Sequence, residues 1–172
     1  MNVFVVGLDH WLQPYDLQEY ADDARREERK IKGQFYEFLD DLIKKEKISF
    51  VGEECRPGEK TIPRELAREN RCEYGEIDMP QDLRRAANIP EDYEQHQGAV
   101  RDRGISLRED YMVKRFRELK TMDGPGLVIC GAEHIPGLEK LLACNGDKVF
   151  TTDVRAAAWY DTILNKFLRG EI

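Results

Sequence analysis

Short apolar runs, separated by longer segments with helical spacing, constrain the fold of this chain more than any other feature. Five runs have this character, at residues 2–8, 48–52, 72–78, 127–130 and 149–152, of which 72–78 alternates only weakly. A run that is apolar at nearly every position is typical of a parallel strand covered on both faces. Strands that alternate with helices form mostly parallel sheets. We therefore predict an α/β fold in a single domain spanning residues 1–172: a mostly parallel sheet of about five strands with helices on both faces.

The segments between the runs predict the helices. The longest, at residues 16–47, is highly charged and presents either a solvated face or a homodimer surface. Thr61 and Ser106 suit helix N-caps. Residues 89–103 are polar with little periodicity and predict a lid or a mobile loop. Further helices are expected at residues 61–70, 81–88, 137–144 and 156–169.

The composition narrows the class of protein. The formal net charge is -7, which predicts no general affinity for nucleic acid or for anionic membranes. No apolar run approaches the ~20 residues needed to span a bilayer, and the first residues lack the basic region of a signal peptide. The four cysteines are widely spaced, without a Cys-x-x-Cys pattern, and predict reduced thiols and a cytoplasmic location.

Two of the three histidines follow an apolar run in the same way. Gly7-Leu8-Asp9-His10 follows the first run, and Gly131-Ala132-Glu133-His134 follows the fourth. A glycine at this point permits a tight turn and the close approach of a ligand. Because ligands of an open parallel sheet bind at the carboxyl ends of its strands, we expect both histidines at one edge. Carboxylates reach the same edge after the second and third runs, at Glu53 or Glu54 and at Asp78.

Imidazoles and carboxylates at one edge predict one of two chemistries. His10, His134, Asp78 and either Glu53 or Glu54 could bind a divalent metal ion such as zinc, manganese or cobalt, whose bound water attacks carbonyl or phosphoryl centres. Without a metal, a His and a Glu can act as a general base and its orienting partner.

The neighbours of these residues refine the prediction. Since successive side chains of a strand point to opposite faces, only one of Glu53 and Glu54 should face the site. Asp9 and Glu133, each next to a histidine, could orient the imidazoles from outside.

The segment Arg108-Glu109-Asp110-Tyr111-Met112, followed by the strand that leads into Gly131-Ala132-Glu133-His134-Ile135-Pro136-Gly137-Leu138, resembles the TraB/Tiki family. That family belongs to a wider group with the erythromycin-esterase and ChaN-like proteins. It carries an Arg-x-x-Tyr-Met helix, two Gly-x-x-His motifs and a glutamate after the second strand. Glu133 departs from the pattern, since the family usually has a small residue there, and this chain is shorter than the usual members.

The resemblance implies a set of roles. Tiki members are metal-dependent proteases, erythromycin esterases hydrolyse a lactone, and ChaN-like members bind haem iron. Transferred to this chain, the functional residues are His10, Glu53 or Glu54, Arg108 and His134. Arg108 suits a clamp for an anion or a developing oxyanion, because its guanidinium presents a fork of donors.

We therefore predict a metal-assisted hydrolase of a small-molecule or peptide substrate, with the bond cleaved left open. A second hypothesis is a non-catalytic protein that holds a metal, haem or a nucleotide-like ligand at the same edge. A third is a stress or defence component that acts through protein partners. A nucleic-acid substrate also stays open, because the same strand and helix order occurs in nucleases.

Overall fold

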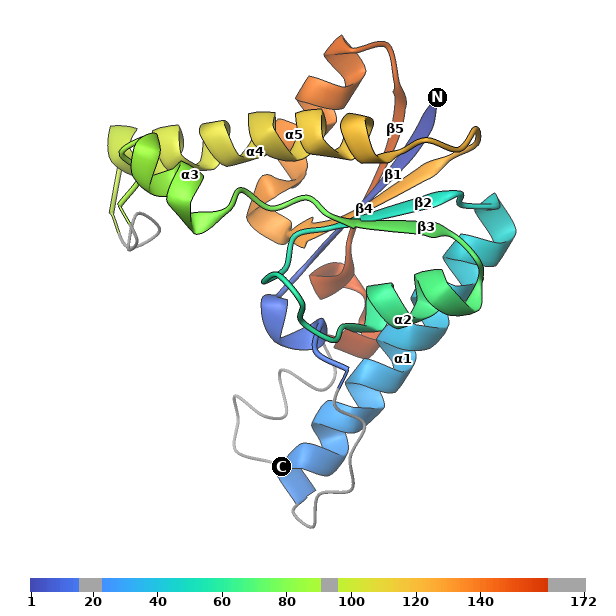
Figure 1. Cartoon of the computed structure of the whole chain (residues 1–172). Helices are drawn as coiled ribbons and strands as arrows, with labels where there is room; N and C mark the ends of the chain where they lie inside the picture. Colours follow the sequence, from blue (N-terminus) through green and yellow to red (C-terminus); the bar gives the residue numbers. More distant parts are fainter. Residues whose placement is uncertain (16–22, 91–95, 161–172) are drawn as a thin grey trace.

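A five-stranded parallel sheet forms the centre of the computed structural model, which describes residues 1–15, 23–90 and 96–160 (Figure 1). All four strand pairings are parallel, in the order β3-β2-β4-β1-β5. This confirms the predicted α/β fold and its strand number. The strands are β1 (Asn2–Leu8), β2 (Phe50–Glu53), β3 (Glu73–Glu76), β4 (Gly126–Gly131) and β5 (Lys148–Asp153).

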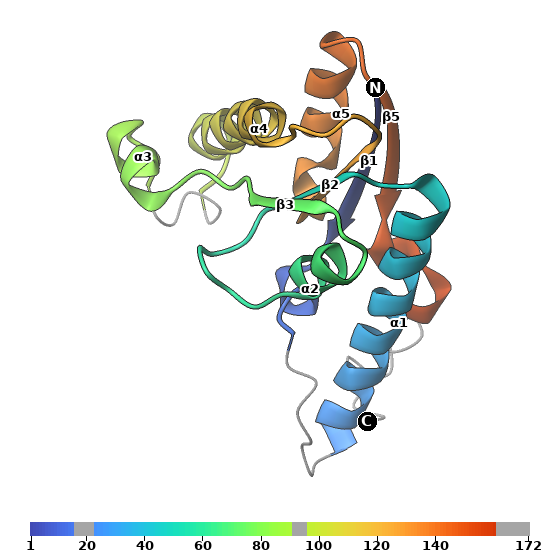
Figure 2. The same ribbon diagram turned by 45° about the vertical axis from the view of Figure 1, so that its right-hand side comes forward.

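Helices cover both faces of the sheet (Figure 2). One face carries α1 (Asp23–Glu46) and α2 (Ile62–Glu69), and the other carries α4 (Ala99–Leu119) and α5 (Ile135–Cys144). A short helix, α3 (Gln81–Ala86), follows β3. A 3₁₀ turn follows each of three strands: η1 (His10–Leu12) follows β1, η3 (Ala132–His134) follows β4, and η4 (Val154–Ala156) follows β5.

Each face of the sheet has its own apolar core. In α1, the residues Ile31, Phe35, Leu39 and Ile43 recur every four positions, so that they form one stripe against the sheet. They pack with α2 against the sheet residues Phe4, Val6, Val51, Leu127 and Ile129. The opposite core joins Met112, Phe116, Leu138 and Leu142 to Val3, Val5, Phe50 and Val128. Since neighbouring strand residues belong to different cores, β1, β2 and β4 carry apolar residues on both faces, as expected for covered parallel strands.

Where the predicted helix boundaries fall within the described residues, they agree with the structure with one clear exception. Thr61 caps α2 as predicted, and its side chain accepts a hydrogen bond from Arg64 N at 3.3 Å. The prediction that Ser106 begins a helix is wrong, because α4 begins at Ala99 and follows Gly98 with a positive φ of 66°. Residues 99–103 of the predicted loop are therefore helical, and 91–95 lie outside the described residues.

Parts of two other predicted helices also lie outside the described residues, at 16–22 and 161–172, so the homodimer surface over residues 16–47 stays a prediction. No helix in the described ranges is long and apolar enough to cross a membrane.

The strand order places three chain segments side by side at the carboxyl edge of the sheet. β4 lies between β1 and β2, so the residues that follow these three strands are neighbours although they are far apart in sequence. The pairing of β2 with β4 continues one step beyond β2, where Glu54 N donates to Ile129 O at 2.8 Å. This edge is where ligands of open parallel sheets bind.

Candidate functional site

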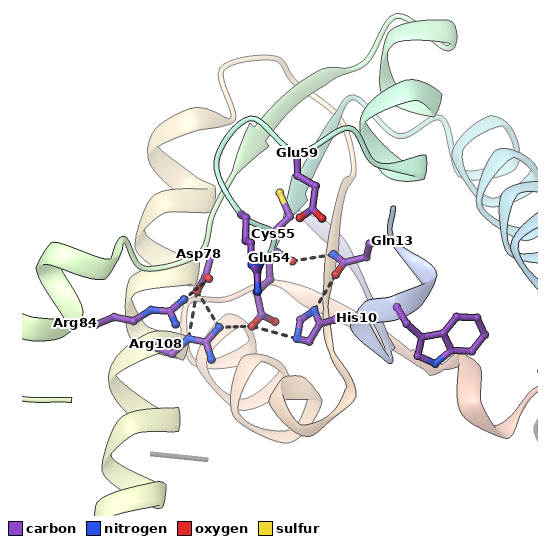
Figure 3. Close-up of a pocket in the computed structure, with 10 residues that line it drawn as sticks. His10, Gln13, Glu54, Cys55, Glu59, Asp78, Arg84 and Arg108 are labelled. Atoms are coloured by element: carbon purple, nitrogen blue, oxygen red, sulfur yellow. Dashed lines mark hydrogen bonds and ion pairs between the residues drawn. The ribbon is translucent and has the colours of Figure 1, made fainter. Parts of the chain in front are cut away.

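Four predicted site residues converge at the carboxyl edge of the sheet. His10 begins η1 directly after β1, Glu54 follows β2, and His134 ends η3 after β4. Arg108 reaches the same point from α4. A pocket of about 470 Å³ opens above them, and Figure 3 shows His10, Glu54 and Arg108 pointing toward one another at its floor.

The carboxylate of Glu54 is the centre of this cluster. Its side chain is 1% exposed, and its Oε1 atom accepts a hydrogen bond from Arg108 Nη2. The same oxygen lies 3.6 Å from His10 Nε2 and 3.5 Å from His134 Nε2, while Oε2 accepts from Gly131 N at 2.7 Å. Burial alone would raise the pKa of Glu54, but His134, Arg108 and His10 outweigh burial and hold this pKa well below its usual range. Glu54 is therefore a buried carboxylate that stays ionised.

His134 is a buried imidazole held between two carboxylates. Its side chain is fully buried, and Nδ1 lies 3.2 Å from Glu109 Oε1. Within the described residues, Nε2 makes no hydrogen bond although it faces Glu54. Burial by itself would lower the pKa of His134, but the interactions with Glu109 and Glu54 are stronger and raise it to about 9. The ring therefore carries a positive charge at neutral pH.

His10 is the exposed member of the pair. Its side chain is 56% exposed, lines the pocket and contacts Gln13 Oε1 through Nδ1 at 2.8 Å. A Cβ on Gly131 would lie 3.0 Å from His10 Nε2 and 3.6 Å from Glu54 Oε2. The glycine of the second Gly-x-x-His motif thus gives the imidazole of the first motif room to approach Glu54.

Asp78 belongs to the pocket but contacts arginines rather than histidines. Its Oδ1 atom accepts from Arg108 Nη2 at 3.0 Å and from Arg108 Nε at 3.2 Å, and its Oδ2 atom accepts from Arg84. Asp78 therefore holds the guanidinium that contacts Glu54 (Figure 3). The predicted role of Asp78 as a metal ligand finds no support in these contacts.

Glu53 points away from the pocket, so of the two adjacent glutamates it is Glu54 that faces the histidines. The fully buried Glu53 carboxylate accepts hydrogen bonds from Gln13 Nε2 at 3.0 Å, Thr61 Oγ1 at 2.6 Å and Tyr74 OH at 2.7 Å. Burial raises the pKa of Glu53 to about 7, against the opposing effect of these three donors. Its contact with Gln13 Nε2 links Glu53 to His10.

The residues that orient the imidazoles differ from those predicted. Asp9 accepts from Tyr160 OH, and Glu133 accepts from Arg101 Nη2 at 2.8 Å, with its other oxygen 4.0 Å from His134 Nε2. The Nδ1 atoms contact Gln13 and Glu109 instead. Gln13 could have been noticed as a polar residue one turn after His10, and Glu109 as a carboxylate beside Arg108 in the helix motif.

The donor types at this edge of the sheet suit a divalent cation, but Arg108 competes with a cation for Glu54. Ligands of a tetrahedral zinc ion at about 2.1 Å lie about 3.4 Å apart, close to the two N···O distances at Glu54 Oε1. However, Arg108 occupies that oxygen, so a cation there would lie beside a fixed positive charge. Among the described residues, no group of three or more His, Cys, Asp or Glu side chains is placed to hold a metal ion. The metal ion stays a prediction.

Comparison with known proteins finds no relative of this chain. No protein-family model matches the chain, and no significant match was found among curated proteins or solved structures. The TraB/Tiki resemblance therefore rests on the sequence motifs alone.

Proposed function

We propose that this protein is a hydrolase that activates water at His10 and binds a small-molecule or peptide substrate in the pocket above Glu54. The observation that supports this function is the convergence of two imidazoles and one guanidinium on a single buried carboxylate oxygen, at the floor of an open pocket. Such clusters of perturbed ionisable groups in a cleft are typical of catalytic sites.

His10 is the residue best placed to act as the general base. Its imidazole is exposed to the pocket, whereas His134 is fully buried and already protonated. His10 Nε2 would take a proton from water as the oxygen attacks a carbonyl or phosphoryl centre, and would return it to the leaving group. Glu54 Oε1 lies 3.6 Å from this nitrogen, and its negative charge stabilises the imidazolium that exists between the two proton transfers.

The arginines supply positive charge for the developing anion. Arg108 and Arg84 both line the pocket, and Asp78 holds both guanidiniums. Donors that are fixed before the reaction stabilise a transition state without reorganisation. Cys55 also lines the pocket, but burial raises the pKa of its thiol to about 12, so a thiolate nucleophile is disfavoured and water is the nucleophile proposed.

We also propose a cytoplasmic location. All four cysteines, Cys55, Cys72, Cys130 and Cys144, are free, and this fits a reducing compartment.

The test is a turnover assay with ester, peptide and phosphodiester substrates. His10→Gln should lower kcat by about 10²- to 10⁴-fold, the range typical of a lost general base. His96→Gln is the matched control, because His96 is exposed and lies outside the pocket. The proposal would be contradicted if His10→Gln retained wild-type turnover, or if the wild-type protein turned over none of the substrates.

The same assay tests the predicted metal ion. The protein is treated with a chelator and then supplied with zinc, manganese or cobalt. Turnover lost with the chelator and restored by one ion indicates a metal-assisted hydrolase. Turnover that continues after complete chelation indicates catalysis by the side chains alone.

A further inference from the structure

We propose that Gln13 is a positioning residue, held by Glu53, that fixes His10 in the tautomer with its proton on Nδ1. This inference deepens the proposed function, since it explains how His10 keeps Nε2 free to accept a proton. It assigns roles to two buried polar residues: Gln13, which lines the pocket beside His10, and Glu53, which lies behind Gln13.

The hydrogen bonds of Gln13 determine which way its amide faces. Gln13 Nε2 lies 2.7 Å from the main-chain oxygen of Glu54 and 3.0 Å from Glu53 Oε1. A main-chain carbonyl can only accept, so the NH₂ group of the amide must face it. The assignment does not depend on whether Glu53 is protonated, because the Glu54 carbonyl alone requires it.

The amide orientation then determines the tautomer of His10. With its NH₂ group directed at Glu53 and Glu54, Gln13 turns its Oε1 atom to His10 Nδ1 at 2.8 Å. An amide oxygen can only accept, so Nδ1 must carry the hydrogen. Neutral His10 consequently has its lone pair on Nε2, the atom beside Glu54 and Gly131. Free imidazole side chains prefer the opposite tautomer, so the fold must impose this one.

Gln13 is held rigidly enough to impose the tautomer with its proton on Nδ1 of His10. Its residue is 3% exposed, and its main-chain oxygen accepts from Ile62 N at 2.8 Å. Glu53, which anchors the amide, is itself held by the hydroxyls of Thr61 and Tyr74. The loop after β1 is thus fastened to the start of α2, and the amide has little freedom to rotate. Buried networks in which every member is bonded fix side chains in this way.

The experiment is ¹⁵N NMR of the histidine rings, which distinguishes the two tautomers without any substrate. At a pH where His10 is neutral, the wild-type spectrum should show a protonated Nδ1 and a lone pair on Nε2. Gln13→Met should shift the ring toward the opposite tautomer, and Gln34→Met, at an exposed glutamine of α1, should leave it unchanged. Glu53→Gln should also retain the wild-type tautomer, because its amide oxygen can still accept from Gln13.

The outcomes separate this inference from the proposed function. A proton on Nε2 in the wild type, or a tautomer unchanged by Gln13→Met, overturns the inference. The wild-type spectrum decides even if Gln13→Met does not fold. Once a substrate is found, Gln13→Met should lower kcat/KM by about 10- to 100-fold, the cost typical of lost orienting contacts. If the spectrum shows the predicted tautomer but the protein turns over no substrate, the hydrolase proposal is contradicted and the tautomer inference stands.

Discussion

The charge of buried His134 should make folding stability depend on pH in a defined direction. Burial alone would lower the pKa of His134, but the neighbouring carboxylates of Glu109 and Glu54 raise it from 6.5 to about 9, and the side chain is fully buried. The folded protein therefore holds a proton that the unfolded chain releases between these two values. The stabilisation is complete below pH 6.5 and is lost as the pH rises through about 9. At about 1.4 kcal/mol per pH unit, the interval corresponds to about 3 kcal/mol of unfolding free energy.

The measurement is urea denaturation of the wild type and of His134→Gln at pH values from 6.5 to 9, followed by the fluorescence of Trp11 and Trp159. Glutamine does not titrate, and both proteins share every other ionisable group. The difference between their unfolding free energies should therefore fall by about 3 kcal/mol across this range. His96→Gln, at an exposed histidine, should show no comparable change. A difference that is constant with pH, or that grows as the pH rises, would refute the assignment of a buried imidazolium.

Three further substitutions test the packing around the cluster. Gly131→Ala places a methyl group 3.0 Å from His10 Nε2, so we expect about a 100-fold loss of kcat, measured in the turnover assay. Gly137→Ala places its methyl group 1.8 Å from Glu109 Oε2 and should destabilise the fold by about 1–3 kcal/mol, measured by urea denaturation; an unchanged midpoint would contradict this. Thr61→Ala removes the N-cap of α2 and one donor to the buried Glu53 carboxylate, and should cost about 1–3 kcal/mol in the same measurement. Thr61→Ser keeps the hydroxyl and should retain most of the stability.

The fold was predictable because β1 and β4 are apolar on both faces, and segments with helical spacing separate all five strands. Parallel strands end at one edge, so the sequence alone indicated that His10, His134 and either Glu53 or Glu54 would be neighbours. The spacing did not show that β4 lies between β1 and β2, or that both histidines would approach the same oxygen of Glu54, at 3.6 Å for His10 Nε2 and 3.5 Å for His134 Nε2. Strand order depends on contacts between distant segments and leaves no local pattern.

The choice between Glu53 and Glu54 shows where strand alternation becomes uninformative. Phe50 belongs to the core beneath α4 and α5, and Val51 to the core beneath α1 and α2. Glu54 shares the face of Phe50, and Glu53 shares the face of Val51. Since both faces of β2 are apolar, the pattern cannot say which one carries Arg108. Only the position of α4 settles that Glu54 faces the pocket.

The start of α4 was missed because its first two turns carry no apolar stripe. Residues such as Val100, Asp102 and Arg103 are exposed, so periodicity begins only near Arg108, where the helix becomes buried against the sheet. A helix that projects beyond the layer it covers loses the hydrophobic period on which sequence prediction depends.

The two Gly-x-x-His motifs are alike in sequence, yet their histidines have different electrostatic roles. His134 is fully buried, and its Nδ1 contacts a carboxylate, so it keeps its proton and acts as a fixed cation beneath Glu54. His10 is 56% exposed, and its Nδ1 contacts an amide, which orients the ring without adding a charge. A base must release and accept protons during each turnover, and a fixed cation must not. The partner at Nδ1 therefore separates the two roles, and neither partner belongs to the motif that places the histidine.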